Sequence, residues 1–315
     1  MKKALTITIV VIALLIAIPL LFLAFRPNLI HSREQEKAWF AQPTSHFIQW
    51  RGAEIHYLDE GQGVPVVMLH GFGGNHRNFE KLKERMKGTY RVIRIDLPGF
   101  GLSDLPRPDG DKTNYLTEYR DFMRFMVDTL HLDSVYVIGN SMGGMMSWNM
   151  AVDQPQKVKK LVLIGSAGYE LDKVAKNAVA AGLLQSSIMR FIVGKGVPLA
   201  TSISLAHRIY ADTAKINWKE IENNNRFWNR NGNLKAAGML IASRQFPDST
   251  LITQVRCPTL IIWGKNDQIV PLRHAYKFQR DIQGSQLYLL DTCGHVPMIE
   301  RTDETAAAIQ RFFAE

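Results

Sequence analysis

The chain has 315 residues, of which 46% are hydrophobic, 21% charged and 10% aromatic. This composition is typical of globular proteins and excludes a disordered or collagen-like chain. Two cysteines, Cys257 and Cys293, are too few for a disulfide scaffold, and the sequence has no CxxC motif that would indicate structural zinc. The net charge of +9 favours anionic surfaces. Because no basic run is interleaved with aromatic residues, we do not expect a nucleic-acid partner.

The N-terminal segment differs from the rest of the chain. Residues 4–25 carry no charged side chain, and the run is long enough to cross a hydrocarbon core of about 30 Å as a helix. A secretory signal has a shorter apolar region, of roughly 7–15 residues, followed by small residues at a cleavage site. Here Arg26 and Pro27 follow. We therefore predict an uncleaved membrane anchor over residues 1–26 in preference to a cleaved signal peptide.

The flanking charges bear on orientation. Lys2 and Lys3 precede the apolar run and compete with Arg26, Arg33 and Lys37 on its other side. A short N-terminal tail with two lysines before a large domain favours the cytoplasmic side for the tail. The remainder of the chain is then expected on the periplasmic or extracytoplasmic side of the membrane. Residues 27–46 are polar and contain Pro27 and Pro43, so they are predicted to form a tether.

From residue 47 onward, short apolar runs alternate with stretches of helical periodicity. Strands are predicted at 47–50, 54–58, 66–69, 90–95, 135–138, 161–164, 259–263 and 286–290, and helices at 78–86, 114–130, 142–152, 272–282 and 303–313. This alternation is typical of an α/β fold with a parallel sheet covered on both faces. Residues 165–255 interrupt it with helical, partly apolar stretches and no convincing strand. We predict a core at 47–164 and 256–315 with a helical cap at 165–255.

The first catalytic signal is G-x-S-x-G at residues 139–143, centred on Ser141. It follows the predicted strand 135–138 and opens a helix, the context in which a sharp turn exposes a nucleophilic serine at a sheet edge. The alternative is an ordinary strand–helix turn with a capping serine. The residues that follow later in the chain disfavour that alternative.

A serine hydroxyl needs a base to take its proton and an acid to orient that base. Asp267 follows the predicted strand 259–263, and His295 follows the predicted strand 286–290. Carboxyl ends of parallel strands meet at one edge of the sheet, where open α/β sheets form their sites. The order Ser, Asp, His is that of α/β-hydrolases. Ser141, Asp267 and His295 are therefore the predicted catalytic residues.

Acyl transfer also needs hydrogen-bond donors for the oxyanion. The sequence His70-Gly71-Phe72-Gly73-Gly74 follows the predicted strand 66–69, so the backbone N–H of Phe72 is one candidate and that of Met142 is the other. A plain glycine loop is the alternative. A further turn at residues 96–104 is predicted to be scaffold.

Five motifs together resemble, in order, those of the α/β-hydrolase superfamily. They are HGFGG at 70–74, DLPGFGLSD at 96–104, GNSMGG at 139–144, WGKNDQIVP at 263–271 and CGHVPMIE at 293–300. The resemblance spans about residues 47–314 and implies an eight-stranded, mostly parallel sheet with a cap inserted after strand 6. Ser141 disfavours haloalkane dehalogenases and epoxide hydrolases, which carry an aspartate at the nucleophile.

The chain looks most like the serine esterase and lipase branch, in particular membrane-anchored monoacylglycerol lipases and bacterial lipase/esterases. That resemblance implies a hydrolase of lipid-like acyl esters that works without cofactor or metal. GNSMGG also occurs in hydrolases that cleave carbon–carbon bonds of aromatic ring-fission products, although those usually carry Trp where this chain has Val296. A non-catalytic binding protein on a hydrolase fold is a third possibility.

Three further expectations follow. Some superfamily members place the acid after the sixth strand, so Glu170 or Asp172 would then replace Asp267. Cys257 precedes its strand and Cys293 follows its strand, so they are expected at opposite sheet edges and unbridged. Apolar stretches of the cap at 180–184, 188–193 and 197–205 are expected to form an acyl pocket near the membrane, or else to pack the cap onto the core.

Overall fold

The computed structural model describes residues 27–106, 115–170, 194–243 and 248–315. In these ranges no helix is both long and apolar enough to cross a membrane. The predicted anchor at residues 1–26 lies outside them.

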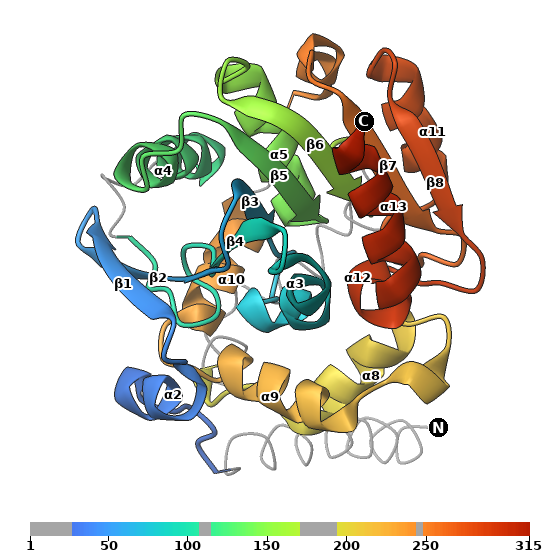
Figure 1. Cartoon of the computed structure of the whole chain (residues 1–315). Coiled ribbons are helices and arrows are strands. Elements are labelled where there is room, and N and C mark those ends of the chain that lie inside the picture. The colour runs from blue at the N-terminus through green and yellow to red at the C-terminus, as the bar shows by residue number, and fades with distance from the viewer. Residues whose placement is uncertain (1–26, 107–114, 171–193, 244–247) are drawn as a thin grey trace, which may run out of the picture.

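The core is one eight-stranded sheet in the order β1-β2-β4-β3-β5-β6-β7-β8 (Figure 1). Its strands are β1 Ser45–Trp50, β2 Ala53–Glu60, β3 Val64–Leu69, β4 Tyr90–Ile95, β5 Val135–Asn140, β6 Val158–Ile164, β7 Thr259–Gly264 and β8 Gln286–Leu290. Strand β2 pairs antiparallel with β1 and β4, and all other pairs are parallel. This confirms the predicted eight-stranded, mostly parallel sheet.

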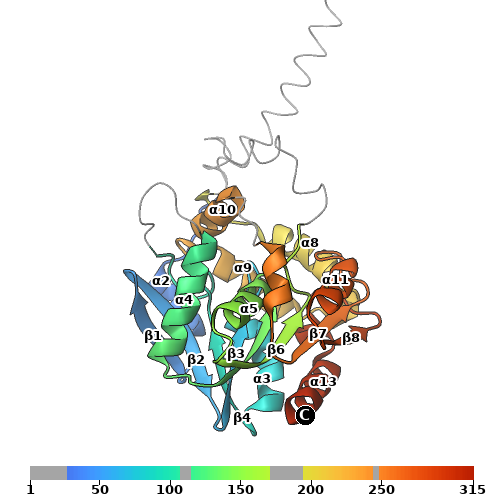
Figure 2. The same cartoon turned by 90° about the horizontal axis from the view of Figure 1, so that it is seen from above.

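Helices cover both faces of the sheet because successive strand residues point to opposite sides (Figures 1 and 2). Along β3, Val67 and Leu69 join the apolar cluster on one face, while Val66 and Met68 join the cluster on the other. The first face is covered by α4 Tyr115–Thr129, α5 Met142–Asp153 and α11 Arg273–Asp281, and the second by α3 Glu80–Met86, α12 Pro297–Glu300 and α13 Thr302–Ala314. A short 3-10 turn, η1 His76–Phe79, precedes α3.

In the described part of the insertion between β6 and β7, every regular element longer than an isolated bridge is helical. It contains α8 Leu199–Ile209, η3 Thr213–Lys215, α9 Trp218–Trp228, α10 Asn233–Ser243 and η4 Ser249–Gln254. Two of the apolar stretches predicted for an acyl pocket, 180–184 and 188–193, lie outside the described residues. The third, 197–205, includes the first turns of α8.

A buried and a partly exposed ion pair hold this insertion on the core. The guanidinium of Arg230 donates to Asp104 Oδ1 at 2.6 Å and to the carbonyl oxygens of Leu102 and Ser103. A second ion pair joins Arg77 to Glu220 of α9 at 2.6 Å. A buried guanidinium with several acceptors fixes orientation strongly, because removing one partner would leave a buried charge unpaired.

The prediction that residues 27–46 form a tether is wrong, because most of them fold against the cap and the core. Helix α2 spans Arg33–Phe40 and begins with a capping box in which Ser32 and Gln35 each accept the other's backbone N–H. The ring of Phe40 packs 4.3 Å from that of Phe227 in α9. The backbone of His31 pairs with that of Arg230 in an isolated parallel bridge. The sequence did not predict this helix because the segment is polar and the residue that buries Phe40 is far away in the sequence.

Both cysteines are free thiols, as predicted. Cys257 lies just before β7, and Cys293 lies beyond the end of β8. Burial raises the pKa of Cys257 to about 11 and that of Cys293 to about 12. Both thiols are therefore protonated at neutral pH and poorly reactive.

Helix α2 also buries a carboxylate without a hydrogen-bond partner. Both carboxylate oxygens of Glu36 are buried and unpartnered among the described residues. Burial raises the pKa of Glu36 to about 7, although the charges of Arg230 and Arg226 act in the opposite direction. Between its ordinary value and about 7, the folded state holds a proton that the unfolded chain has lost. The free energy of unfolding therefore falls as pH rises through this window.

Replacing the carboxylate tests this. Glu36→Gln removes the ionisation, so its stability relative to the wild type should improve from about pH 5 to about pH 8, by about 1–3 kcal/mol. Urea unfolding of both proteins at the two pH values measures the difference. The same stability difference at both pH values would contradict the assignment.

Candidate active site

Ser141 occupies a strained turn between β5 and α5. Its backbone has φ 54° and ψ −116°, a region that costs a non-glycine residue about 1–3 kcal/mol. Glycines make the turn possible, since a Cβ at Gly143 would overlap the carbonyl oxygens of Leu69 and His70. The side chain of Ser141 is thereby held beside Gly71, where an added Cβ would lie 3.0 Å from the Ser141 Cβ.

Asp267 and His295 form a buried pair. Nδ1 of His295 donates to Asp267 Oδ2 at 2.7 Å. The other carboxylate oxygen, Oδ1, accepts the backbone N–H groups of Ile269 at 2.8 Å and Val270 at 2.9 Å. Both side chains are buried. Because Nδ1 carries the shared proton, Nε2 is the nitrogen left to act as a base.

The three segments meet at the carboxyl edge of the sheet. The side chain of Asn140, adjacent to Ser141, donates through Nδ2 to the carbonyl oxygens of Ile164 at 3.0 Å and His295 at 3.1 Å. A Cβ at Gly165 would lie 3.2 Å from both Asp267 Oδ2 and His295 Nδ1. The segment after β6 therefore contacts both the Ser141 turn and the Asp267–His295 pair.

Neither of the two alternative acids, Glu170 and Asp172, is placed against His295 by the described structure. Glu170 is exposed at the start of the insertion, and Asp172 lies outside the described residues. Asp267 is the carboxylate that contacts His295, which supports the first choice.

The predicted oxyanion donors lie on either side of this turn. Met142 is the first residue of α5, so its N–H is among those that have no partner in the helix ladder. Phe72 lies in a tight turn in which Gly74 N–H donates to Gly71 O at 3.0 Å. Gly73 has φ 70°, and a Cβ there would overlap the ring of Trp228.

His70 shapes this loop without taking part in proton transfer. Its Nδ1 donates to Gly71 O at 2.7 Å, and its Nε2 accepts the backbone N–H of Leu97 at 3.0 Å. Burial lowers the pKa of His70 to about 4. The ring is therefore neutral at neutral pH, and both nitrogens are used to hold the main chain.

Aromatic rings of the core and the cap cluster around Phe72. The Phe72 ring lies 5.3 Å from that of Phe100 and 5.8 Å from that of Trp228 in α9. Phe72 is 39% exposed, so it presents an apolar face to solvent next to the Ser141 turn.

The loop at 96–104 is held in place by a buried carboxylate. Asp96 is fully buried and accepts from the rings of His56 and His76 and from the N–H of Leu102. These hydrogen bonds and the neighbouring charges hold the pKa of Asp96 well below its usual range. His56, His76 and Asp96 also form the one group in the described chain that could hold a metal ion. The Nδ1 atoms of both histidines contact Asp96.

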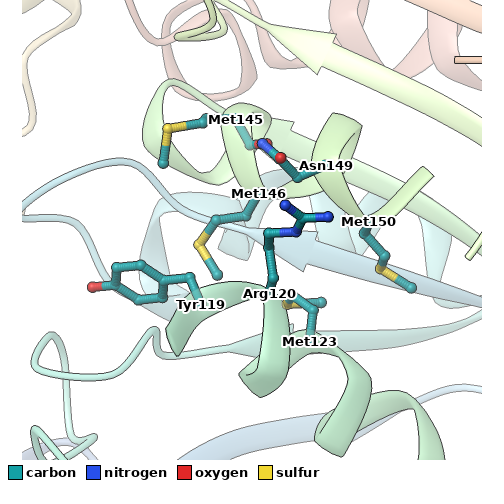
Figure 3. Close-up of a pocket in the computed structure, with 7 residues that line it drawn as sticks. All are labelled: Tyr119, Arg120, Met123, Met145, Met146, Asn149 and Met150. Atoms are coloured by element: carbon teal, nitrogen blue, oxygen red, sulfur yellow. The ribbon is translucent and has the colours of Figure 1, made fainter. Parts of the chain in front are cut away.

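A small pocket lies apart from this site, between α4 and α5 (Figure 3). Its lining residues are Tyr119, Arg120, Met123, Met145, Met146, Asn149 and Met150. None of the predicted catalytic residues contributes to it.

Sequence reasoning missed three contributors: Asn140, Gly165 and Glu300. Asn140 lies within the G-x-S-x-G motif at its variable position, and Gly165 follows β6 without any motif. Glu300 ends the stretch CGHVPMIE and accepts the N–H of Gly294 at 2.7 Å. The sequence does not indicate which backbone groups this carboxylate reaches.

Known proteins resemble this chain over most of its length. A family model described as the alpha/beta hydrolase fold matches residues 64–191 and 195–302. A 2-hydroxy-6-oxo-6-(2'-aminophenyl)hexa-2,4-dienoic acid hydrolase from Metapseudomonas resinovorans is 30% identical over 295 residues, covering 90% of this chain and 94% of the relative. Lipase 1 from Psychrobacter immobilis is 29% identical over 276 residues, covering 83% of this chain and 81% of the relative.

A solved structure shows the same fold. A serine hydrolase involved in carbazole degradation superposes with a TM-score of 0.71 at 28% identity, covering 86% of this chain and 98% of that one. The family match covers well over half of the chain, and these relatives are named as hydrolases and as a lipase. The chain therefore belongs to the α/β-hydrolase fold family and is a hydrolase.

Proposed function

We propose that the protein is a serine hydrolase that cleaves carboxylic esters through an acyl-enzyme. The observation that carries the proposal is the buried Asp267–His295 hydrogen bond of 2.7 Å at the sheet edge where Ser141 occupies its strained turn. A serine, a base and an acid that orients the base are the parts that nucleophilic acyl transfer requires.

In this mechanism Ser141 Oγ attacks the ester carbonyl carbon while His295 Nε2 takes the hydroxyl proton. The N–H groups of Phe72 and Met142 stabilise the resulting oxyanion. When the tetrahedral intermediate collapses, the alcohol leaves with the proton from His295. Water then attacks the acyl-enzyme, again giving a proton to Nε2, and the carboxylic acid departs from a regenerated Ser141. Asp267 holds the ring and stabilises its charged form throughout.

The substrate class is proposed to be lipid-like. The exposed face of Phe72, next to Phe100 and Trp228, supports an apolar acyl group. Residues 4–25 form an uncharged apolar run, which we propose anchors the enzyme to a membrane with its folded part on the periplasmic or extracytoplasmic side. The net charge of +9 favours anionic headgroups. An enzyme held at a bilayer gains most from substrates that partition into it.

Carbon–carbon bond hydrolysis is the second candidate. It is favoured by the 30% identical relative named for a hexadienoic acid substrate. The same serine, histidine and aspartate would serve that reaction, so the two candidates differ in the substrate pocket. Val296 stands where the carbon–carbon hydrolases usually have Trp, which favours the ester reaction.

Removing the nucleophile or the base tests the mechanism. Ser141→Ala and His295→Ala should each lower kcat for p-nitrophenyl butyrate by at least about 10³-fold, because triad residues act as a unit. Circular dichroism should show that both variants stay folded. If Ser141→Ala kept more than about a tenth of the wild-type rate, the serine mechanism would be wrong. If the wild-type protein hydrolysed nothing, a non-catalytic binding role would replace it.

The identity of the acid is tested by three neutral variants. Asp267→Asn should lower kcat by roughly 10³–10⁴-fold, since an amide favours the wrong histidine tautomer. Glu170→Gln and Asp172→Asn should keep near-normal rates with the same ester. Loss of activity in either of these two variants, together with an active Asp267→Asn, would reassign the acid.

A substrate panel separates the two candidate reactions. Esters of graded acyl length should be hydrolysed with kcat/KM rising from acetyl to medium-chain substrates, because each buried methylene contributes about 0.8 kcal/mol. Anionic vesicles should increase this preference in the full-length chain and less in a chain lacking residues 1–26. A strict preference for acetyl esters would contradict the lipid-like class. Turnover of a vinylogous diketo acid without ester turnover would favour the carbon–carbon reaction.

A further inference from the structure

Glu300 is a buried carboxylate that the proposed mechanism does not use. It lies at the end of α12 and is only 4% exposed. Its two oxygens accept three backbone N–H groups. Oε1 accepts from Ala211 at 3.0 Å and from Asp212 at 2.7 Å, while Oε2 accepts from Gly294 at 2.7 Å.

These N–H groups come from two distant segments. Ala211 and Asp212 follow α8 in the cap, whereas Gly294 is the residue before His295. One carboxylate therefore joins the cap to the loop that carries the proposed base. Hydrogen bonds to an ionised carboxylate are roughly twice as strong as those between neutral groups.

A second set of contacts links the same two segments. The N–H of His295 donates to Ile209 O at 2.7 Å, and a Cβ at Gly294 would overlap that same carbonyl oxygen. The Nζ of Lys215, further along the cap, donates to Glu300 O at 3.2 Å. The consecutive amides of Gly294 and His295 are thus held, one by Glu300 and the other by the last residue of α8.

We propose that Glu300 is a positioning residue that couples the cap segment after α8 to the placement of His295. The inference rests on the proposed function, since it assigns His295 as the base. Asp267 fixes the imidazole ring through Nδ1, whereas Glu300 fixes the main chain from which that ring projects. A displacement of the segment at 209–212 would move the backbone of His295 with it.

The geometry requires a carboxylate. Each oxygen of Glu300 faces at least one N–H donor, so both must accept. A glutamine amide has a single oxygen, and in either orientation its NH₂ group would face an N–H of the cap or of Gly294. Glu300→Gln keeps the size of the side chain but loses the contacts on one side. Glu304→Gln is the matched control, because Glu304 is also on the C-terminal helices but exposed and paired with Arg301.

Hydrogen–deuterium exchange of the full-length protein tests the coupling without using activity. In Glu300→Gln, peptides covering 208–213 and 292–296 should exchange at least about 10-fold faster together, with β3 and β4 unchanged. Unchanged exchange, or faster exchange throughout the chain, would overturn the proposal. Glu304→Gln should behave as the wild type in all of these peptides.

Kinetics with p-nitrophenyl butyrate supply the second readout. Glu300→Gln should lower kcat by about 10- to 100-fold with little change in KM, as expected when a catalytic group is slightly misplaced. Lys215→Met, at an exposed position, should lower kcat by about fivefold, the equivalent of one hydrogen bond. A kcat within about twofold of wild type in both variants would overturn the proposal. An inactive wild type would instead refute the ester mechanism, while the exchange measurement still decides the coupling.

Discussion

The hydrogen bond from His295 to Asp267 is the interaction on which the rest of the site depends. It is buried, and the second oxygen of Asp267 is held by the N–H groups of Ile269 and Val270. With both oxygens engaged, the carboxylate can rotate little, so it fixes both the tautomer and the orientation of the imidazole. The ring can then offer Nε2 to the hydroxyl of Ser141 only if β5 ends at the same edge of the sheet as β7 and β8.

The sheet provides that presentation through close backbone approach. Strands β5, β7 and β8 end at one edge and deliver Ser141, Asp267 and His295, while the turn after β3 delivers Phe72. Gly143 and Gly165 allow these loops to approach more closely than side chains would permit. Asn140 then ties the serine strand to the carbonyl of His295, and Glu300 ties the histidine loop to the cap. The loop that carries His295 is therefore hydrogen-bonded both to the core, through Asn140, and to the insertion, through Glu300.

Much of this arrangement could be predicted from the sequence. Strand β4 has the predicted bounds, and β3, β5 and β7 differ only at their ends, because buried parallel strands are continuous apolar runs between turn residues. The placement of Asp267 and His295 was predictable because each follows the carboxyl end of a parallel strand. Helix α2 was not predictable, because Phe40 is buried by Phe227, which lies in the cap. Glu300 was missed because its partners are backbone N–H groups, and a backbone group has no residue type that a sequence could reveal.

The central claim is that Ser141 is a nucleophile activated by His295. Treating the full-length protein with a fluorophosphonate and mapping the adduct by peptide mass spectrometry tests it most directly. The account predicts one adduct, on Ser141, formed at least about 10²-fold more slowly when His295 is replaced by alanine. An unlabelled Ser141 in the folded wild-type protein, or equal labelling rates with and without His295, would contradict it.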